Sequence, residues 1–262
     1  MTEFRASGAK ILLNKVPQVT LYFWLIKVLA TTVGETAADY LSVNLGLGLT
    51  GTTYATGTLL LVVLALQLRS PRYIPVTYWV AVVLLSVFGT LITDNLVDNF
   101  RIPLETTTAV FAIALAATFG AWYLSEKTLS ITTIHTTRRE LFYWAAILFT
   151  FALGTAGGDL LAEGLAVGYA YSVLIFAAAI AIIALAHFRF GLNGVFAFWA
   201  AYVLTRPLGA SLGDLLSQES GKGGLGWGSF ATSLAFLATI ASLIVYLSLN
   251  PQKDVLPAIA AD

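Results

Sequence analysis

One pattern occurs four times along this chain and limits the folds open to it. An aromatic residue and a tryptophan are followed by a glycine ten residues after the tryptophan, and by an aspartate five residues after the glycine. The tryptophans are Trp24, Trp79, Trp144 and Trp199, the glycines are Gly34, Gly89, Gly154 and Gly209, and the aspartates are Asp39, Asp94, Asp159 and Asp214. Four matches at several fixed positions indicate an internal repeat, so we expect four similar units.

The composition predicts that these units lie in a membrane. Hydrophobic residues make up 58% of the chain and charged residues 11%, with a mean hydropathy of +0.83, whereas a soluble domain averages about 25% charged residues. A helix that spans a bilayer needs about 20 apolar residues. Eight such segments are predicted, at about 18–44, 51–69, 76–99, 105–125, 140–163, 166–188, 192–217 and 228–249.

Each copy of the repeat contains two of these segments, which gives all four copies the same orientation in the membrane. The copies are therefore parallel repeats, unlike the inverted repeats of many transporters. We predict an all-α integral membrane protein of eight transmembrane helices, a single membrane domain over residues 1–262, arranged as a pseudo-fourfold ring or as two halves. The repeats cover about 16–70, 71–126, 136–190 and 191–250.

The basic residues predict the orientation of the helices. Ten of them fall on the side that holds both termini, namely Arg5, Lys10, Lys15, Arg69, Arg72, Lys127, Arg138, Arg139, Arg189 and Lys253. The opposite loops hold Arg101 and Lys222. Because basic loops stay in the cytoplasm, we expect a multi-pass protein of the inner membrane with both termini cytoplasmic. No cleavable signal peptide is evident in the first 17 residues.

The repeat resembles a known bacterial family. Proteins of that family contain four tandem repeats of a domain of unknown function, and each repeat has two transmembrane segments and a characteristic tryptophan. All four tryptophan positions of this chain match, and the resemblance extends from about residue 16 to 250. It implies the eight-helix architecture and no particular activity.

The spacing within each copy predicts where its residues lie. Fifteen residues of helix separate the tryptophan from the aspartate, about 22 Å. We expect the tryptophan at the cytoplasmic interface, where such rings anchor helices, and the aspartates at one shared depth toward the outer side. The glycine and the small residue before each aspartate form a small-xxx-small pair that permits close helix contact. The aspartate-bearing helices are therefore predicted to form an inner ring.

Acidic residues are unusually frequent in these segments. Besides the four aspartates, Glu35 precedes Asp39 by one turn, and Asp98 and Glu163 follow their aspartates by one turn. A charge at membrane depth costs about 2.5–3.5 kcal/mol, so the seven carboxylates are candidates to bind cations or protons. The alternative is hydrated helix ends, which fits Asp98 and Glu163 best.

Two basic residues interrupt the repeat inside the predicted spans. Lys27 lies three residues after its tryptophan, where its side chain is expected to extend to the interface. Arg206 is deeper, precedes Pro207, and is expected to compensate an aspartate or to act as a tethered cation during transport. We place Arg206 and Lys27 as charge-compensating residues.

These features favour a transporter of a hard cation such as Mn, Mg or Ca, with or without exchange for protons, because carboxylates and hydroxyls suit such ions. The metal ligands would be Asp39, Asp94, Asp159 and Asp214. Two alternatives remain: a proton-coupled transporter of a small organic substrate, and a non-transporting membrane scaffold. No enzyme motif and no basic patch for nucleic acid is present. Partners are thus the lipid bilayer and a cation or small-molecule substrate, with no cofactor beyond a bound divalent cation.

Overall fold

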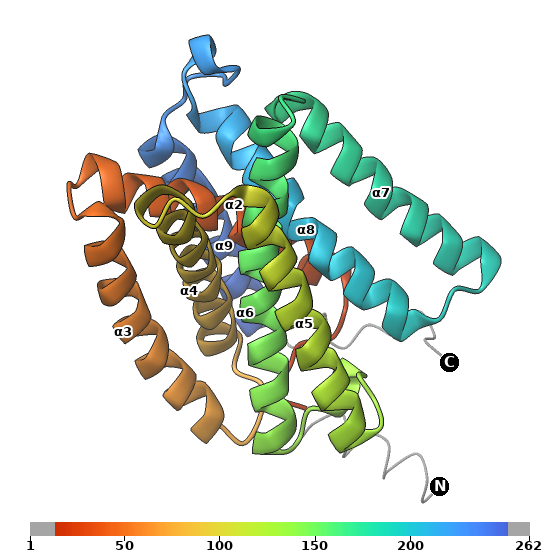
Figure 1. Ribbon diagram of the computed structural model, residues 1–262. Helices are drawn as coiled ribbons and strands as arrows, with labels where there is room; N and C mark the ends of the chain where they lie inside the picture. Colours follow the sequence, from red (N-terminus) through yellow and green to blue (C-terminus); the bar gives the residue numbers. More distant parts are fainter. Residues whose placement is uncertain (1–13, 251–262) are drawn as a thin grey trace, which may run out of the picture.

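The computed structural model describes residues 14–250, which form eight long α-helices and no strand (Figure 1). The helices are α2 (Leu21–Asp39), α3 (Gly48–Arg69), α4 (Pro75–Asp94), α5 (Leu104–Glu126), α6 (Thr137–Asp159), α7 (Tyr169–Phe190), α8 (Gly194–Ser217) and α9 (Ser229–Leu249). Each predicted span therefore corresponds to one helix. The predicted domain extends beyond this range, and Arg5, Lys10 and Lys253 lie outside the described residues.

Seven of the eight helices, α3 to α9, are long and apolar enough to cross a membrane. The remaining helix, α2, contains Lys27, Glu35 and Asp39 within its 19 residues. These three charged residues lower the apolar character of α2. The helix is nevertheless enclosed by α4, α8 and α9. The chain is accordingly a multi-pass membrane protein.

The even-numbered helices form a closed ring. Helix α2 packs against α4, α4 against α6, α6 against α8, and α8 against α2. The predicted inner ring of aspartate-bearing helices is thus confirmed, and it closes as a pseudo-fourfold bundle. In Figure 1 the outer helices α3 and α7 lie on opposite sides of this bundle, with α5 in front.

Each outer helix packs on the inner helix of the following repeat. Helix α3 packs on α4, α5 on α6 and α7 on α8, and α9 of the last repeat packs on α2 of the first. Tyr22 of α2 and Tyr246 of α9 are in ring contact at 5.8 Å, which brings the start and the end of the helical bundle to the same end. Because each outer helix packs on the next repeat, all four repeats are held together in one bundle.

Local sequence determines where the inner helices begin. Thr20, Thr136 and Asn193 each accept a hydrogen bond from a backbone N–H of the first turn of α2, α6 and α8. Helix α4 instead begins with Pro75, whose missing N–H costs nothing in a first turn. The helices thereby start at comparable heights, so that equivalent repeat positions meet around one axis.

Candidate functional site on the central axis

The residues near the ring axis lie in layers one helical turn apart. They follow each repeat tryptophan by 3, 7, 11 and 15 positions, a spacing that keeps side chains on one helix face. In repeat order the layers are Lys27, Val82, Ile147 and Tyr202; Thr31, Ser86, Phe151 and Arg206; Glu35, Thr90, Thr155 and Ala210; and the four aspartates. The first end of the axis is called the tryptophan end below and the other the aspartate end.

A closed ring of aromatic side chains lies at the tryptophan end. The aromatic residue before each tryptophan contacts the tryptophan of the next repeat, and the last repeat contacts the first. The ring centroids are 5.6 Å apart for Phe23 and Trp79, 5.4 Å for Tyr78 and Trp144, 6.1 Å for Tyr143 and Trp199, and 5.7 Å for Phe198 and Trp24. The repeated dipeptide thus closes the bundle at this end.

The expectation that the tryptophans anchor the helices at the lipid interface is wrong for three of them. Trp79, Trp144 and Trp199 are 1%, 4% and 5% exposed, and only Trp24 is half-buried. The reason is geometric, since inner helices present this position to their neighbours and not to lipid.

Lys27 does not extend to the interface as expected. Its side chain is fully buried, and its Nζ lies 4.3 Å from the ring centroids of Phe151 and Tyr202. Within residues 14–250, this Nζ has no hydrogen-bond partner and no ion pair with a carboxylate. Lys27 therefore forms no ion pair with an aspartate, and its Nζ lies against the faces of two aromatic rings.

Arg206 joins all four repeats at the centre of the axis. Its Nη2 donates hydrogen bonds to Glu35 Oε2 at 3.0 Å, to Thr155 Oγ1 at 2.7 Å and to Thr90 Oγ1. Its Nη1 donates to the Thr31 carbonyl at 3.2 Å. The three side-chain acceptors occupy the same repeat position, eleven residues after the tryptophan. A single guanidinium thus fills the centre of that layer.

Arg206 forms its ion pair with Glu35 and not with a repeat aspartate, although its charge also interacts favourably with Asp94 and Asp159. The two side chains are 0% and 8% exposed and form an ion pair of 3.0 Å. Sequence reasoning predicted compensation by Arg206 but missed this partner, because Glu35 lies 171 residues away. Aligning the four repeats by their tryptophans would have placed Glu35, Thr90 and Thr155 in the layer next to that of Arg206.

The repeat glycines make the close approach of the inner helices possible. A Cβ on Gly34 would overlap Ser86, one on Gly89 would overlap Phe151, and one on Gly154 would overlap Arg206. In the fourth repeat a Cβ on Gly209 would overlap Thr31, which closes the ring. Each glycine therefore faces the residue seven positions after the tryptophan of the next repeat. At these contacts the backbone of one inner helix lies directly against a residue of its neighbour.

The four aspartates lie around the aspartate end of the axis. Asp94 interacts electrostatically with Asp39, Asp159 with Asp94, and Asp214 with both Asp159 and Asp39. All four also interact with Glu35. Asp214 is 6% exposed and the other three are half-buried. The structure thus brings the predicted aspartates into one ring, with Glu35 deeper on the axis.

A change of helix type follows three of these aspartates. Asp39, Asp94 and Asp159 end α-helices that continue as π-helical turns at Tyr40–Asn44, Asn95–Asn99 and Leu160–Gly164. Such wider turns are rare and are found mostly at functional sites. In the fourth repeat α8 continues through Asp214 to Ser217, and Gln218 Nε2 donates to Asp39 Oδ2 at 3.5 Å.

The aspartates surround the axis without converging on a point. Among the described residues, no group of three or more acidic or histidine side chains is placed to hold a metal ion. The direct metal ligation expected of the four aspartates is therefore not seen. Each aspartate stands on a separate helix, and packed helix axes are about 8–10 Å apart.

The second carboxylates of repeats two and three lie nearer the helix ends than the ring aspartates, and both interact electrostatically with Asp39. Asp98 and Glu163 are exposed, and Glu163 accepts a hydrogen bond of 2.7 Å from the Tyr169 hydroxyl. Their position near the helix ends is the one that fits simple hydration.

A buried polar cluster at the tryptophan end was missed from sequence. Lys15 Nζ lies 2.7 Å from Glu140 Oε2, and both side chains are buried. Gln67 Nε2 donates to Glu140 Oε1 at 3.1 Å, and Lys15 Nζ also donates to the Leu68 carbonyl at 3.0 Å. From the sequence, Lys15 is one of the basic residues that predict orientation, and nothing marks it as the partner of Glu140. No sequence periodicity reveals this cluster, because it joins a segment before α2 to α3 and α6.

The axis holds carboxylate oxygens at the aspartate end and the Arg206 guanidinium in its middle. Carboxylate and hydroxyl oxygens bind hard cations, and here the Arg206 guanidinium occupies such a set. The aromatic ring closes the other end. This arrangement can attract cations to the aspartate end, and the Arg206 guanidinium fills the middle of the axis.

The comparisons with known proteins agree with the repeat. A family model described as Repeat of Unknown Function (DUF347) matches four successive stretches, residues 22–73, 77–128, 142–192 and 197–251. No curated protein and no solved structure matches the chain. The four matches contain the four tryptophans and together cover most of the sequence. The chain therefore belongs to the family of proteins built from the DUF347 repeat.

Proposed function

We propose that this protein is a membrane transporter of a hard cation, in which the aspartate ring gathers the ion and Arg206 gates the axis. The observation that carries the proposal is the oxygen cage of Glu35, Thr90 and Thr155, which surrounds a guanidinium at the centre of a fourfold ring. A protein that needed only a structural ion pair would not require an acidic ring beyond it.

The orientation rests on the described basic residues. Seven lie at the tryptophan end and two, Arg101 and Lys222, at the aspartate end; the seven are Lys15, Arg69, Arg72, Lys127, Arg138, Arg139 and Arg189. By the distribution of basic loops, the tryptophan end faces the cytoplasm and the protein resides in the inner membrane. The aspartate ring then faces outward, where a local excess of negative charge raises the concentration of cations.

The cation would reach the cage in a hydrated state. Since the aspartates do not converge on a point, they act through their field and through water. Magnesium-like ions keep several waters and take one or two carboxylates from a protein. When Arg206 leaves the cage, Glu35 supplies one carboxylate and the two threonines supply hydroxyls. Exchange for protons on the aspartate ring is compatible with this scheme.

The test is flux into liposomes that contain the purified protein and a dye for Mn²⁺, Mg²⁺ or Ca²⁺, each ion added alone. Asp159→Asn is expected to abolish most of the flux of the transported ion. Glu219→Gln is the matched control, because Glu219 is an exposed acid at the same end outside the ring. Unchanged flux in all four single Asp→Asn variants would overturn the proposal.

One observation favours a second candidate, a proton-coupled transporter of a small organic acid. Lys27 and Arg206 place two basic groups near the axis, close enough to interact electrostatically, and only Glu35 forms an ion pair with either of them among the described residues. The Arg206 guanidinium keeps its positive charge, which opposes cations and attracts an anionic substrate group. Uptake of labelled short-chain carboxylates that depends on acid pH and is lost in Lys27→Met, with no metal flux, would favour this candidate.

A further inference from the structure

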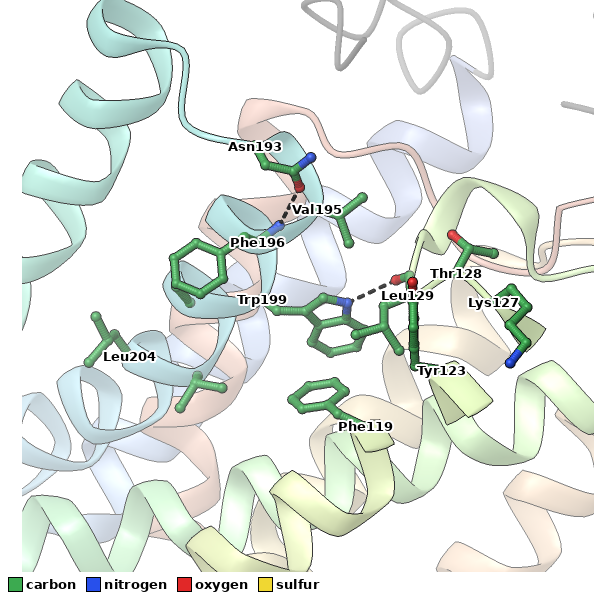
Figure 2. A pocket seen from close by; sticks show the side chains of 12 residues that line it. Phe119, Tyr123, Lys127, Thr128, Leu129, Asn193, Val195, Phe196, Trp199 and Leu204 are labelled. Carbon is green, nitrogen blue, oxygen red and sulfur yellow. Dashed lines mark hydrogen bonds between the residues drawn. The ribbon is translucent and has the colours of Figure 1, made fainter. Parts of the chain in front are cut away.

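Two grooves on the outer surface of the bundle are counterparts in different repeats. The first lies between α5 and α8 and has a volume of about 700 Å³ (Figure 2). The second lies between α9 and α4 and has a volume of about 260 Å³. Their inner-helix walls are equivalent in the repeat, with Trp199, Ala200, Val203 and Leu204 in the first and Trp79, Val80, Val83 and Leu84 in the second. The grooves are therefore related by the pseudo-twofold axis.

The first groove differs from its counterpart by a polar end. Lys127 and Thr128 line this end together with apolar side chains, whereas among residues 14–250 the second groove is lined only by apolar residues and Trp79. In Figure 2 Lys127 lies at one end of the lined space, with Phe196 and Leu204 at the other. An ordinary gap between helices would be expected to look alike in both places.

The ten extra residues between the second and third repeats create this difference. Residues 127–129 of the loop that they form line the groove, and Trp199 Nε1 donates to the Leu129 carbonyl at 2.9 Å (Figure 2). The equivalent Trp79 Nε1 has no hydrogen-bond partner among residues 14–250. The insertion thus shapes the first groove.

Lys127 occupies a backbone position that favours glycine. It ends α5 in the left-handed conformation, with φ of 58°, where helices usually carry glycine or asparagine. Its side chain is exposed and forms no ion pair within the described part of the chain, because the adjacent Glu126 faces Arg138 at 3.6 Å. A positive charge is thereby held, unneutralised, at the end of an apolar groove.

We propose that the first groove binds one anionic phospholipid. Its acyl chain would lie along Phe119, Val203 and Leu204, and its phosphate would meet Lys127 and Thr128. Lysine near a membrane surface attracts anionic lipids, and Tyr123 of the groove suits the headgroup level, where such rings gather. The proposal is independent of the transported substrate.

Native mass spectrometry of the full protein tests the proposal. The detergent-solubilised protein is titrated with phosphatidylglycerol or with phosphatidylcholine of identical chains. The wild-type protein is expected to retain one molecule of phosphatidylglycerol in preference to phosphatidylcholine. Lys127→Gln is expected to lower this retention about fivefold, the factor that corresponds to one lysine at an anionic surface. Lys127 is exposed, so this variant leaves the core intact.

The counterpart groove supplies a matched control. Val203→Trp fills the first groove and is expected to abolish the preferential retention, whereas Val83→Trp fills the second and is expected to leave it unchanged. Equal retention of both lipids by wild type would overturn the proposal. So would an unchanged preference in Lys127→Gln, or an equal loss in the two tryptophan variants.

Discussion

The Arg206 guanidinium and the Glu35 carboxylate form an ion pair 3.0 Å long in the centre of the bundle. The two residues belong to α8 and α2, the inner helices of the fourth and the first repeat. Both side chains are buried, and the pair closes the ring between the fourth repeat and the first. Removing one member leaves the other charge buried without a partner, which in proteins costs about 3–5 kcal/mol. The ion pair therefore holds α2 and α8 together and also forms the proposed gate.

Arg206→Leu is accordingly expected to lower the free energy of unfolding by about 3–5 kcal/mol. The double variant Arg206→Leu with Glu35→Leu is expected to recover much of that loss, because no charge remains buried. Thermal unfolding in detergent measures both. Arg138→Leu is the control, since Arg138 is exposed in its pair with Glu126 and such pairs contribute about 0–1 kcal/mol. A double variant less stable than the single variant Arg206→Leu would contradict this account.

The repeat glycines offer a second prediction. Gly209→Ala is expected to destabilise the protein by about 1–3 kcal/mol, because its Cβ would overlap Thr31 of the neighbouring helix. Gly120→Ala in α5 is the control, since a Cβ there meets nothing within 4 Å. Alanine is the better helix former by about 1 kcal/mol, so this control is expected to melt at or above the wild-type temperature. A similar loss in both variants would argue against glycine-mediated helix contact.

The aromatic ring contains a pair of tyrosine hydroxyls that predicts a non-additive effect. Tyr78 and Tyr143 are hydrogen-bonded to each other through their hydroxyls, whereas the first and fourth repeats have Phe23 and Phe198 at this position. Tyr78→Phe leaves the buried Tyr143 hydroxyl unpaired and is expected to cost about 1–3 kcal/mol. The double variant Tyr78→Phe with Tyr143→Phe is expected to be more stable than either single variant. Denaturant titration measures the difference, and additive losses would contradict it.

Most of the fold is readable from the sequence, because the repeat and the hydrophobic length of its helices are properties of single segments. The inner ring follows from Gly34 and its equivalents, which permit close contact. The order in which the ring closes was not predicted, and with it the partner of Arg206, because contact between neighbouring repeats is a tertiary property. The burial of Trp79 and Lys27 was mispredicted for the same reason: interface rules assume that a helix faces lipid.

The cluster of Lys15, Glu140 and Gln67 predicts how the segment before α2 is held. Lys15→Met is expected to destabilise the protein by about 3–5 kcal/mol, because it leaves the Glu140 carboxylate buried without its cation. It is also expected to speed proteolysis near residues 14–20. Arg69→Met is the control, since Arg69 is an exposed base at the same end. Equal stability of the two variants would mean that the segment is held by backbone contacts alone.

The oxygen cage around Arg206 makes the last prediction, which links stability to function. In Arg206→Gln the guanidinium is gone, while Glu35, Thr90 and Thr155 keep their oxygens at the centre of the layer. A hard divalent cation can then supply the missing charge. Mn²⁺, Mg²⁺ or Ca²⁺ is therefore expected to raise the unfolding temperature of this variant and EDTA to reverse the gain. A ligand at 100 times its dissociation constant contributes about 2.7 kcal/mol.

The same ions are expected to stabilise the double variant Arg206→Gln with Glu35→Gln far less, because its cage has lost the carboxylate. Wild type is expected to respond weakly, since Arg206 already occupies the cage. Thermal unfolding of the three proteins, with each ion alone and at matched ionic strength, separates binding in the cage from screening of the aspartate ring. If the ions raise the unfolding temperatures of the single and double variants equally, they act on the outer aspartates. The cage would then bind only Arg206 and no metal ion.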